Sequence, residues 1–357
     1  MVTLAEIAQQ VGVSTHTVSR VLNGGFKGTY PKVVRRAERI RQVAEELGYR
    51  PNAAAQAVCS GRFGVLGLLM SWTRHYSHLP HQLLSGLHDA AESWGEHLAL
   101  GRVPDEKLSQ EGWLPEILRR WSVDGLLINY HYHLPAGMAE QIRRRRIPAV
   151  WINADQPFDC VRPDDADAGR RLTEHLLERG HQRIAYMDRS HGQAELAQEH
   201  YSAVDRAAGY ELAMRNARLT PRIVRPDRKL GHPESFEHAR ALWRSEDRPS
   251  AVITYALPHA EIVTVAAVME GLVCGRDLEV GTFDTTPAQP HFGYAPITMV
   301  EPYRDLGHAA VTMLHQKIQR PEQQRPVSKL PFRLVTDDTA TSPQTPTAGG
   351  PATPKVQ

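Results

Sequence analysis

The N-terminal part of the chain has apolar residues at the intervals of short amphipathic helices. Three runs of this kind precede Gly48, and their apolar positions are Leu4, Ile7, Ala8, Val11, Val18, Val21, Leu22, Val33, Val34, Ala37, Ile40, Val43, Ala44 and Leu47. Thr3 with Glu6 is a capping-box pair before the first run, and Gly12 suits the tight turn after it. The pattern predicts a helix, a turn and a second helix, followed after a glycine-rich loop by a third helix.

From Val65 onward the pattern changes to short continuous apolar runs that alternate with longer amphipathic stretches. The apolar runs predict strands at 65–70, 97–100, 125–129, 149–153, 184–187, 222–224, 251–254 and 278–283. The stretches between them predict helices near 79–94, 108–121, 137–146, 167–179, 203–216, 234–245 and 260–272. This alternation predicts an α/β fold of two doubly wound subdomains with parallel sheets, whose strand ends border a cleft.

The composition of the connecting segments suggests where the domains end. Residues 51–60 begin with Pro and are rich in Ala, which suits a short hinge helix, and the sequence from about Ser342 is rich in Pro, Thr and Gly, which suits disorder. We expect a headpiece over 1–48, a hinge helix and linker over 49–62, a core over 63–340 and a disordered tail over 341–357. Within the core, we expect one lobe over about 63–160 plus 293–320 and the other over about 161–292 plus 321–340.

The second N-terminal helix leaves several polar residues off its apolar face, namely Thr15, His16, Ser19 and Arg20. A helix-turn-helix places such a second helix in the major groove of DNA. An ordinary helical hairpin is the alternative. The words GVS and TVSRVLN, at this spacing and position, favour DNA binding.

Charge is unevenly distributed along the 357 residues, although the whole chain carries a formal net charge of only +2. Residues 1–62 contain nine Lys or Arg and four Asp or Glu, a net of +5, whereas the remainder carries 33 basic and 36 acidic residues, a net of −3. A basic end on a mildly acidic body is the distribution expected of a separate phosphate-binding module.

Several other classes of protein are disfavoured. The chain shows no apolar run of signal-peptide type and no apolar span of about 18 residues, so we expect a cytoplasmic protein with no membrane partner. Three widely spaced cysteines, Cys59, Cys160 and Cys274, make neither a disulfide framework nor a zinc site. We find no phosphate-cradling loop, no nucleophile–base motif and no acid pair, and therefore expect neither catalysis nor a cofactor.

The histidines raise the question of a metal site, and they are His75, His78, His81, His131 and His133. The first three lie at helical spacing, but Pro80 interrupts them and no Cys or acidic residue completes a ligand set. We expect these histidines on the cleft side of the core or on the surface, without metal.

The words GVSTHTVSRVLNG, ELGYRPNAAAQAV, LLERGHQRIAYM, GTFDTTP and MVEPYRDLGHAAV follow one another along the chain. In these words and their order, the chain resembles the lactose-repressor (LacI/GalR) family of bacterial transcription regulators from Thr3 to about Asp338. The resemblance implies a three-helix headpiece, a hinge helix and a two-lobed core like that of periplasmic sugar-binding proteins. It also implies a homodimer on a near-palindromic operator, controlled by a small effector, which we expect to be a carbohydrate or a derivative.

The resemblance places DNA contacts on particular residues of the headpiece and hinge. It implies that Thr15, His16 and Arg20 read bases, and Arg20 can make a bidentate contact to guanine. It assigns phosphate contacts to Ser14, Thr17 and Asn23, although capping of the second helix is a role that Ser14 and Thr17 can hold at the same time. It puts Val58 at the position of the family's minor-groove leucine, where a shorter side chain implies a weaker kink.

The resemblance also implies effector contacts in the core. Its effector-binding arginine corresponds to Arg206 in DRAAGY, and its aspartate corresponds to Asp284 in GTFDTTP. Asn153, Asp165 and Trp72 also fall near cleft positions. The alternative for Arg206 and Asp284 is a structural ion pair or helix cap, and that for Trp72 is ordinary packing.

The chain departs from the family pattern in the core. The polar Asn-Asp pair after the strand AVIT is Ala256-Leu257 here, the second aspartate of the family word is Thr285, and the aromatic pair before the first core helix is Leu79-Pro80. These changes remove groups that a pyranose would contact. A regulator with a non-sugar effector, or with none, therefore stays open beside the main interpretation, and a cytoplasmic sugar-binding protein is a further alternative.

Overall fold

The structure is a computed structural model that describes residues 2–22, 29–50, 61–73, 77–108, 123–131, 137–187, 200–226, 230–290 and 293–336. The chain divides into an N-terminal compact unit that extends to Val65 and a larger unit that begins at Leu66. The expected hinge helix over 51–60 and the expected tail over 341–357 lie outside the described residues.

The described residues of the N-terminal unit form three helices, α1 (Leu4–Val11), α2 (Thr15–Leu22) and α3 (Pro31–Glu46). The capping box is confirmed, because the backbone N–H of Thr3 donates to Glu6 Oε2 at 2.7 Å and that of Glu6 donates to Thr3 Oγ1 at 3.3 Å. Gly12 ends α1 at φ 73°, which glycine adopts without the strain that a Cβ brings. One residue from each helix, Ile7, Val18 and Ile40, is completely buried in a shared apolar core.

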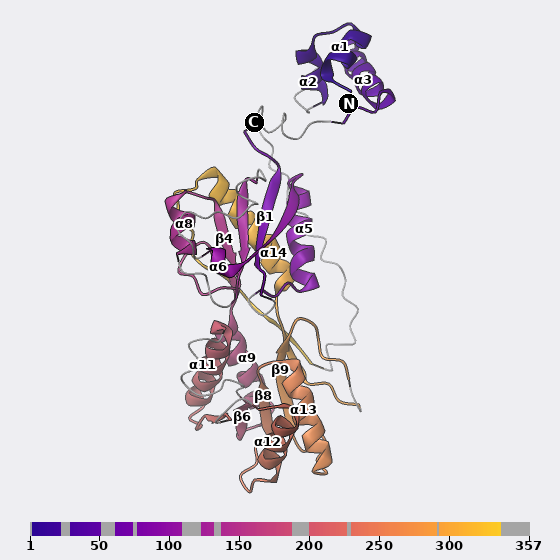
Figure 1. Ribbon diagram of the computed structural model, residues 1–357. Coiled ribbons are helices and arrows are strands. Elements are labelled where there is room, and N and C mark those ends of the chain that lie inside the picture. Colours follow the sequence, from indigo (N-terminus) through magenta and orange to yellow (C-terminus); the bar gives the residue numbers. More distant parts are fainter. Residues whose placement is uncertain are drawn as a thin grey trace. The chain divides into compact units, whose positions relative to one another are not determined.

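The first lobe of the larger unit is built on a six-stranded sheet in the order β11-β5-β4-β3-β1-β2. Its strands are β1 (Val65–Ser71), β2 (His97–Val103), β3 (Gly125–Asn129), β4 (Ala149–Ile152), β5 (Cys160–Pro163) and β11 (Ser328–Leu330). Its helices are α5 (His81–Ser93), α6 (Asp105–Leu108), α8 (Met138–Arg144) and α14 (Tyr303–Gln319) (Figure 1). Leu68, Leu87 and Leu314 are buried together in its core, between the sheet and helices α5 and α14.

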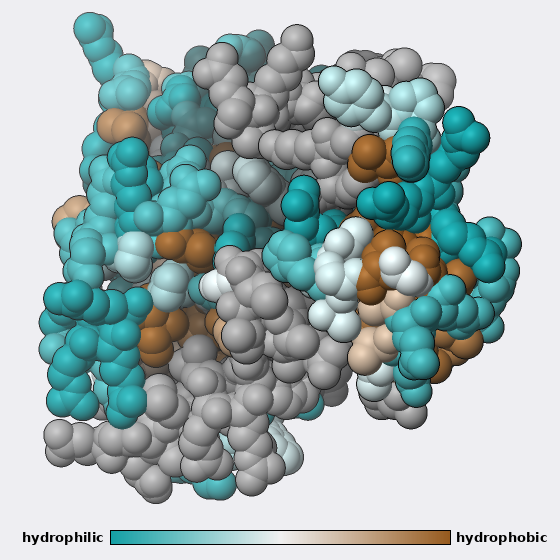
Figure 2. Space-filling model, turned by 90° about the horizontal axis from the view of Figure 1, so that it is seen from above, coloured by the Kyte–Doolittle hydropathy of each residue, from teal (hydrophilic) through white to brown (hydrophobic). Residues whose placement is uncertain are grey.

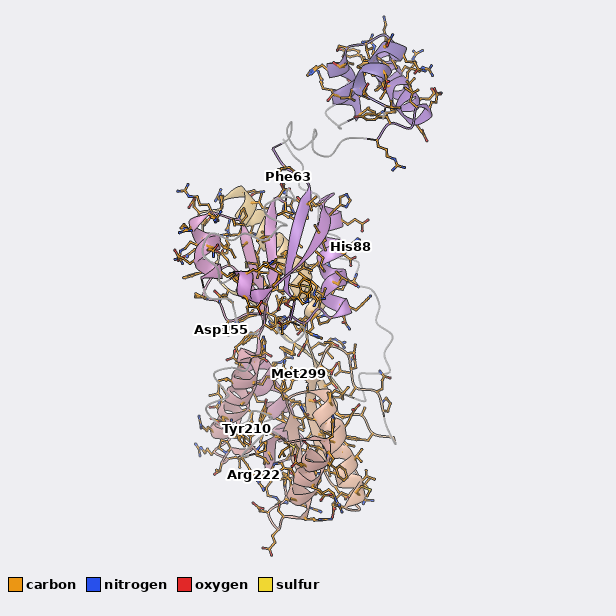
Figure 3. All side chains as sticks on the ribbon, viewed as in Figure 1. Phe63, His88, Asp155, Tyr210, Arg222 and Met299 are labelled. Atoms are coloured by element: carbon orange, nitrogen blue, oxygen red, sulfur yellow. The ribbon has the colours of Figure 1, made fainter. Side chains whose placement is uncertain are left out.

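The second lobe repeats this arrangement with the order β12-β10-β9-β8-β6-β7. Its strands are β6 (Ile184–Met187), β7 (Arg222–Val224), β8 (Ala251–Thr254), β9 (Glu279–Asp284), β10 (Ile297–Val300) and β12 (Arg333–Val335). Its helices are α9 (Asp165–Glu178), α11 (Tyr201–Asn216), α12 (His232–Arg244) and α13 (Leu257–Met269). Tyr210 and Met299 belong to the core that α9 and α11 cover (Figure 3), and a separate cluster including Trp243 and Val263 lies under α12 and α13.

The predicted alternation of strands and helices is confirmed. Strands β1, β3, β4, β5 and β11 pair in parallel, as do β7, β6, β8, β9 and β10, whereas β10 and β12 are antiparallel. In both lobes the chain builds the sheet outward in two directions from its first strand, β1 or β6. Ligands of such folds bind at the carboxyl ends of the strands, where this direction changes. Tyr130 and Tyr255 follow β3 and β8 at such ends.

The structure differs from the expected lobe boundaries. β10 lies in the second sheet, whereas the sequence pattern assigns residues 293–320 to the first lobe, and β11 lies in the first sheet, whereas the pattern assigns 321–340 to the second. β5 pairs wholly in the first sheet, although the expected boundary falls at 160–161. The chain crosses to the other lobe after each of these strands: α9 follows β5, α14 follows β10, and β12 follows β11.

A close helix pair supports each lobe through glycines. A Cβ built on Gly86 of α5 would lie 2.1 Å from the carbonyl oxygen of Arg304, and one built on Gly209 of α11 would lie 2.1 Å from that of Ala166. Both distances are far shorter than a van der Waals contact, so in each helix pair the two backbones pack directly against each other.

Within the described residues, no helix is long and apolar enough to cross a membrane. Hydrophilic residues cover much of the face shown in Figure 2.

Candidate nucleic-acid interface and inter-lobe cleft

The helix α2 presents a polar face to solvent. Thr15, His16 and Arg20 are exposed, while Val18 and Val21 are buried against the other two helices. Because Thr15, His16 and Arg20 lie on neighbouring positions of one helix, their side chains are available together to a ligand at the start of α2. The N-terminal unit therefore has the supported, exposed second helix that the sequence pattern predicts.

The structure gives Ser14 and Thr17 a role at the start of α2. The backbone N–H of Thr17 donates to Ser14 Oγ at 3.2 Å, and the two hydroxyl oxygens lie 2.9 Å apart. The expected capping of α2 is thus confirmed. Ser14 is exposed and Thr17 is half-buried, so the capping geometry leaves the Ser14 side chain accessible. Asn23, Val58 and Cys59 lie outside the described residues.

The helix α3 carries a row of exposed basic residues. Lys32, Arg35, Arg36 and Arg39 are all exposed, and their spacing of three and four residues puts them on one face of the helix. The sequence analysis found the excess of positive charge but not this face. Helical spacing of the basic residues was the signal that identifies it.

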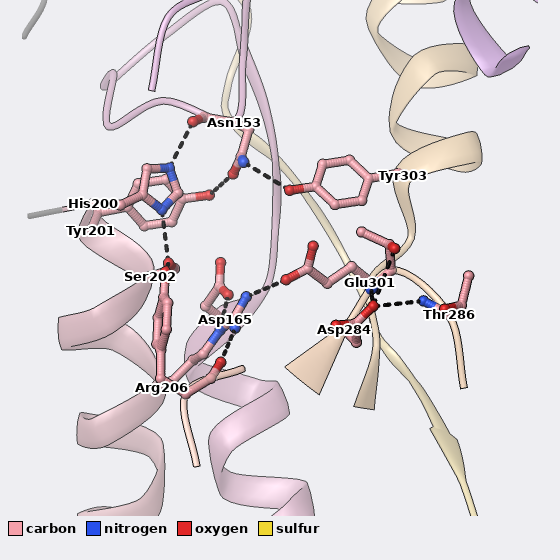
Figure 4. Close-up of polar contacts among 12 residues, drawn as sticks. Asn153, Asp165, His200, Tyr201, Ser202, Arg206, Asp284, Thr286, Glu301 and Tyr303 are labelled. Carbon is pink, nitrogen blue, oxygen red and sulfur yellow. Dashed lines mark hydrogen bonds and ion pairs between the residues drawn. The ribbon is translucent and has the colours of Figure 1, made fainter. Parts of the chain in front are cut away.

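The core holds a buried ionic network around Arg206, which projects from α11 (Figure 4). Its Nε donates to Asp165 Oδ1 at 2.7 Å, and its Nη2 donates to Glu301 Oε1 at 2.6 Å. Its Nη1 donates to the backbone carbonyl of Tyr255 at 2.9 Å. The guanidinium also lies over the ring of Phe283, 4.5 Å from its centroid. Glu301, which precedes the crossing into α14, is a participant that the sequence analysis missed, although it stands in the family-like word MVEPYRDLGHAAV.

Burial and charge act in opposite directions on this network. Burial lowers the pKa of Arg206, but the charges of Asp165 and Glu301 outweigh it and hold that pKa well above its usual value. Burial raises the pKa of Asp165 to about 6, against the lowering effect of Arg206. We treat Asp165 as ionised at neutral pH, since a pKa of about 6 lies below 7 and Arg206 is charged. Within the described residues, its second oxygen, Oδ2, is buried and has no hydrogen-bond partner.

Arg206 and Asp284, the two expected effector contacts, have different partners in the protein. Asp284 ends β9, and its Oδ1 accepts hydrogen bonds from the backbone N–H groups of Thr285 at 2.7 Å and Thr286 at 3.3 Å. Arg206 forms its ion pairs with Asp165 and Glu301 instead. The physical reason is local, because a short carboxylate at a strand end satisfies the backbone of its own turn.

Asn153 connects the two lobes. It follows β4 of the first lobe in a left-handed conformation at φ 51°, which Asn tolerates better than most residues. Its carbonyl oxygen accepts from His200 Nε2 at 3.0 Å, and its Oδ1 accepts from the Tyr201 hydroxyl at 2.7 Å; both partners belong to the second lobe. Its Nδ2 donates to the Tyr303 hydroxyl at 3.3 Å (Figure 4).

The donor directions in this connection are fixed by its chemistry. Because His200 Nε2 faces a carbonyl, it carries the proton, and Nδ1 then accepts from Ser202 Oγ at 2.7 Å. Ser202 Oγ lies 2.8 Å from the Tyr255 hydroxyl, which can donate to it. Burial, followed by the positive charge of Arg206, lowers the pKa of His200 to about 4, so the ring is neutral at physiological pH.

Further histidines lie near the contact between Asn153 and His200, as their positions after strand ends predict. The His131 ring lies 5.5 Å from that of His200 and 6.4 Å from that of His78, between centroids. Burial and the two neighbouring rings lower the pKa of His131 well below its usual value. His81 begins α5 on the surface, whereas His75 and His133 lie outside the described residues. Within the described residues, no group of His, Cys, Asp or Glu side chains is arranged to hold a metal ion.

Trp72 follows β1 at the same end of the first sheet and is 63% exposed. Its backbone is held by Val103 and Arg102, since its N–H donates to the Val103 carbonyl at 2.9 Å and its carbonyl accepts from Arg102 Nη2 at 2.7 Å. Ordinary packing does not describe a ring this exposed, which leaves its face available for stacking.

Two family models match separate parts of the chain. Residues 3–52 match the model described as bacterial regulatory proteins, lacI family, and residues 173–339 match the periplasmic binding protein-like domain. The maltose regulon regulatory protein MalI of Escherichia coli is 29% identical over 360 residues, covering 94% of this chain and 97% of the relative. The ribose operon repressor of Halalkalibacterium halodurans is 27% identical over 343 residues, covering 95% and 97%.

Solved structures share the fold. A lac repressor dimer bound to operator and the anti-inducer ONPF matches with a TM-score of 0.72 at 24% identity, covering 96% of this chain and 99% of that one. The complex of the transcriptional regulator CelR with cellobiose matches with a TM-score of 0.60 at 20% identity, covering 95% and 100%. At these identities, the likeness shows the fold alone.

Proposed function

Because the chain belongs to the LacI family of bacterial regulatory proteins, we propose that it is a sequence-specific DNA-binding transcription regulator, a repressor whose operator affinity is set by a small effector in the core. The observation that carries this proposal is the exposed face of α2, with Thr15, His16 and Arg20, on a capped and buried helix-turn-helix scaffold.

In this proposal, α2 enters the major groove. Arg20 donates two hydrogen bonds to a guanine, and Thr15 and His16 contact neighbouring base edges. Ser14, Thr17 and Asn23 contact phosphates. The exposed basic row on α3, which includes Arg35 and Arg39, supplies the positive field that attracts DNA.

We propose a homodimer on a near-palindromic operator, with Val58 of each hinge in the minor groove at the centre. The supporting observation in the core is the apolar outer face of α13, where Val265, Val268 and Met269 are 45%, 51% and 62% exposed. An apolar face of this kind is suited to burial against a second copy of the chain. One of the similar solved structures is a dimer bound to operator.

We propose that the effector is a carbohydrate or a derivative whose hydroxyl group donates a hydrogen bond to Asp165 Oδ2, the buried oxygen that has no partner among the described residues. Leaving a buried acceptor unpaired costs roughly 1–3 kcal/mol, which a bound hydroxyl group recovers. Asn153, Arg206, Asp284 and Trp72 complete the proposed site, with the Trp72 ring available to stack on a sugar face. Ala256 and Leu257 offer no polar side chains, which favours an effector less polar than a simple hexose.

A non-sugar effector, or none, is the second candidate. It is favoured by the contacts of Arg206, since each of its three guanidinium nitrogens already donates to a protein oxygen. In either case we propose a cytoplasmic regulator without catalytic activity, since the likeness is to transcription regulators.

Coupling between the proposed effector site and the DNA-binding headpiece requires no chemical reaction. We propose that effector binding changes the closure of the lobes, which Asn153, His200 and Tyr201 hold together, and that closure sets whether two hinge segments can pair on DNA. An effector shifts this equilibrium only by its difference in affinity for the two states.

The test is a fluorescence-anisotropy titration of the full chain with DNA fragments from the region upstream of its own gene and from neighbouring promoters. We expect one fragment to bind far more tightly than a shuffled sequence of the same composition, and a panel of sugars and sugar derivatives to contain one that changes its affinity. Equal binding to all fragments would overturn the regulator assignment. A selective fragment without any active sugar would favour the second candidate.

A further inference from the structure

A cavity of about 270 Å³ opens in the second lobe between α12 and α13, at the carboxyl ends of β6 and β7. Its lining comes from both helices and from the strand ends, namely Met187, Pro226, Leu230, Gly231, His232, Ser235, His238, Pro258, His259 and Ile262. None of these residues belongs to the Arg206 network or to the Asn153 connection. The cavity is therefore separate from the proposed effector site.

The walls of this cavity are held in place by contacts between the two helices. The indole N–H of Trp243 on α12 donates to the backbone carbonyl of Val263 on α13 at 3.0 Å. At the far ends of the helices, Arg240 and Arg244 both donate to the carboxylate of Glu270, at 2.6 and 2.8 Å. The cavity is thus preformed, as small-molecule sites usually are.

The polar lining has one chemical character. Among the described residues that line the cavity, the hydrogen-bonding side chains are three imidazoles and the hydroxyl of Ser235, and no carboxylate is present. His238 Nε2 is buried and has no hydrogen-bond partner among the described residues. An imidazole donates hydrogen bonds in either protonation state and carries positive charge when protonated, so this lining suits an acceptor-rich, negatively charged group.

The helix ends add to this preference. The cavity reaches the first turns of α12 and α13, where the helix dipoles are positive. The helix α13 begins without a side-chain cap and without an acidic residue in its first turn, so it is the end that favours an anion. In α12, the carboxylate of Glu234 already accepts from the backbone N–H of Gly231 at 2.8 Å. The other side of the cavity is apolar, with Met187, Leu230 and Ile262.

We propose that this cavity is a second ligand site, which binds a small organic anion with a phosphate or carboxylate group. The charged group lies among His232, His238 and His259, and the apolar part of the ligand packs on Met187, Leu230 and Ile262. The volume lies just under the range of about 300–1,000 Å³ for pockets that hold drug-sized molecules, so the ligand is small. Pro258 of the lining lies three residues from Tyr255, whose carbonyl binds Arg206, and this short turn joins the two sites.

Isothermal titration calorimetry on the full chain tests the proposal with glucose 6-phosphate, inorganic phosphate and benzoate, and with glucose as the uncharged control. We expect at least one anion to bind, and His238→Gln to weaken it about tenfold or more, the effect of one lost charge-assisted hydrogen bond. His308→Gln, an exposed histidine of α14 far from the lining in sequence, is the matched control and should leave the affinity unchanged. The phosphate and benzoate arms distinguish the two anionic groups.

A second variant covers the case in which His238→Gln fails to fold. Ile262→Trp fills the apolar end of the cavity and should abolish anion binding while circular dichroism and the melting temperature show a folded chain. Absence of heat with all three anions at about 10 mM, or binding that survives both variants, would overturn the proposal. Glucose binding that is also lost in His238→Gln would show a neutral-ligand site and would overturn its anionic character.

Discussion

The imidazole Nε2 of His200 donates a hydrogen bond to the backbone carbonyl of Asn153 at 3.0 Å, so a side chain of one lobe is bonded to the backbone of the other. Both groups are buried, and Tyr201 adds a second bond to the same asparagine. A backbone acceptor cannot be removed by mutation, which makes the histidine the adjustable half of this contact. Protonation of the ring keeps the Nε2–H donor to Asn153 and removes the Nδ1 acceptor of Ser202, within the second lobe.

Stability should fall at acid pH in a way that depends on His200. Its pKa is lowered to about 4 in the folded chain, so the unfolded chain, with a pKa of about 6.5, binds the proton more readily. The stabilising contribution is complete above pH 6.5 and is lost as the pH falls toward 4, to a limit of about 3 kcal/mol at about 1.4 kcal/mol per pKa unit.

Melting curves of the native chain and of His200→Gln between pH 4.5 and 7.5 measure this effect. Asp165 works in the opposite direction, because its raised pKa of about 6 favours the folded chain at low pH, so the difference between the two proteins is the relevant quantity. We expect the difference in melting temperature between the native chain and His200→Gln to narrow or reverse as the pH falls. Parallel curves at all pH values would show that His200 does not titrate in this way.

Removing Arg206 should destabilise the second lobe strongly. Arg206→Met leaves Asp165 and Glu301 as uncompensated carboxylates at a buried site, and breaking a buried pair from one side costs about 3–5 kcal/mol. Arg215→Met, which breaks an exposed pair with Glu211 on the same helix, is the control and should cost less than about 1 kcal/mol. Urea unfolding followed by circular dichroism separates these outcomes; equal losses would contradict the buried network.

The two carboxylates of the proposed effector site should differ in their roles. Asp165→Asn replaces Oδ2, the acceptor without a partner among the described residues, and should reduce effector affinity about tenfold or more. Asp284→Asn instead disturbs the turn in which Asp284 accepts from the backbone N–H groups of Thr285 and Thr286. Both variants should still bind operator in the absence of effector. The measurement is the effector concentration that half-releases operator DNA. A full response in both variants would place the effector elsewhere.

The sequence predicted the order of elements well because the apolar runs and helical periodicity are local signals. It missed β5, β11 and β12, which are three or four residues long and carry polar residues or Pro, so no continuous apolar run marks them. Neither β10 nor α14 was among the predicted elements. It also placed β10 in the wrong lobe. Lobe membership depends on which strand each one pairs with, and pairing between distant segments leaves no local pattern.

The residues of the core site were predicted in part. Arg206 of α11 pairs with Asp165 at the start of α9, and Asn153 after β4 contacts His200 of the second lobe. The protein partners of Arg206 were not predicted: Asp284 accepts from the backbone of its own turn, while Glu301 reaches the guanidinium from the end of the next strand. Competition among nearby carboxylates for one arginine depends on side-chain geometry, which residue type and spacing do not contain.

Close packing of α9 and α11 should make Gly209 intolerant of any side chain. A Cβ there would lie 2.1 Å from the carbonyl of Ala166, so Gly209→Ala must separate the two helices, and overpacking of this kind typically costs about 1–3 kcal/mol. Asn216→Ala at the exposed end of α11 is the control, with a change within about 0.5 kcal/mol. A stabilised Gly209→Ala variant, as helix propensity alone predicts, would contradict the close contact.

Arg20 should determine operator specificity more than affinity for DNA in general. It is exposed on α2 beside His16, and loss of a bidentate contact to guanine costs about 1–3 kcal/mol of discrimination. Arg20→Ala should therefore bind the operator about 10- to 100-fold more weakly and bind shuffled DNA almost as before, whereas Arg39→Ala on α3 should weaken both about equally and lower the salt dependence. Anisotropy titrations on operator and shuffled DNA at several salt concentrations distinguish these patterns. If Arg20→Ala weakened both DNAs to the same extent, Arg20 would be a phosphate contact and the base-reading assignment would be wrong.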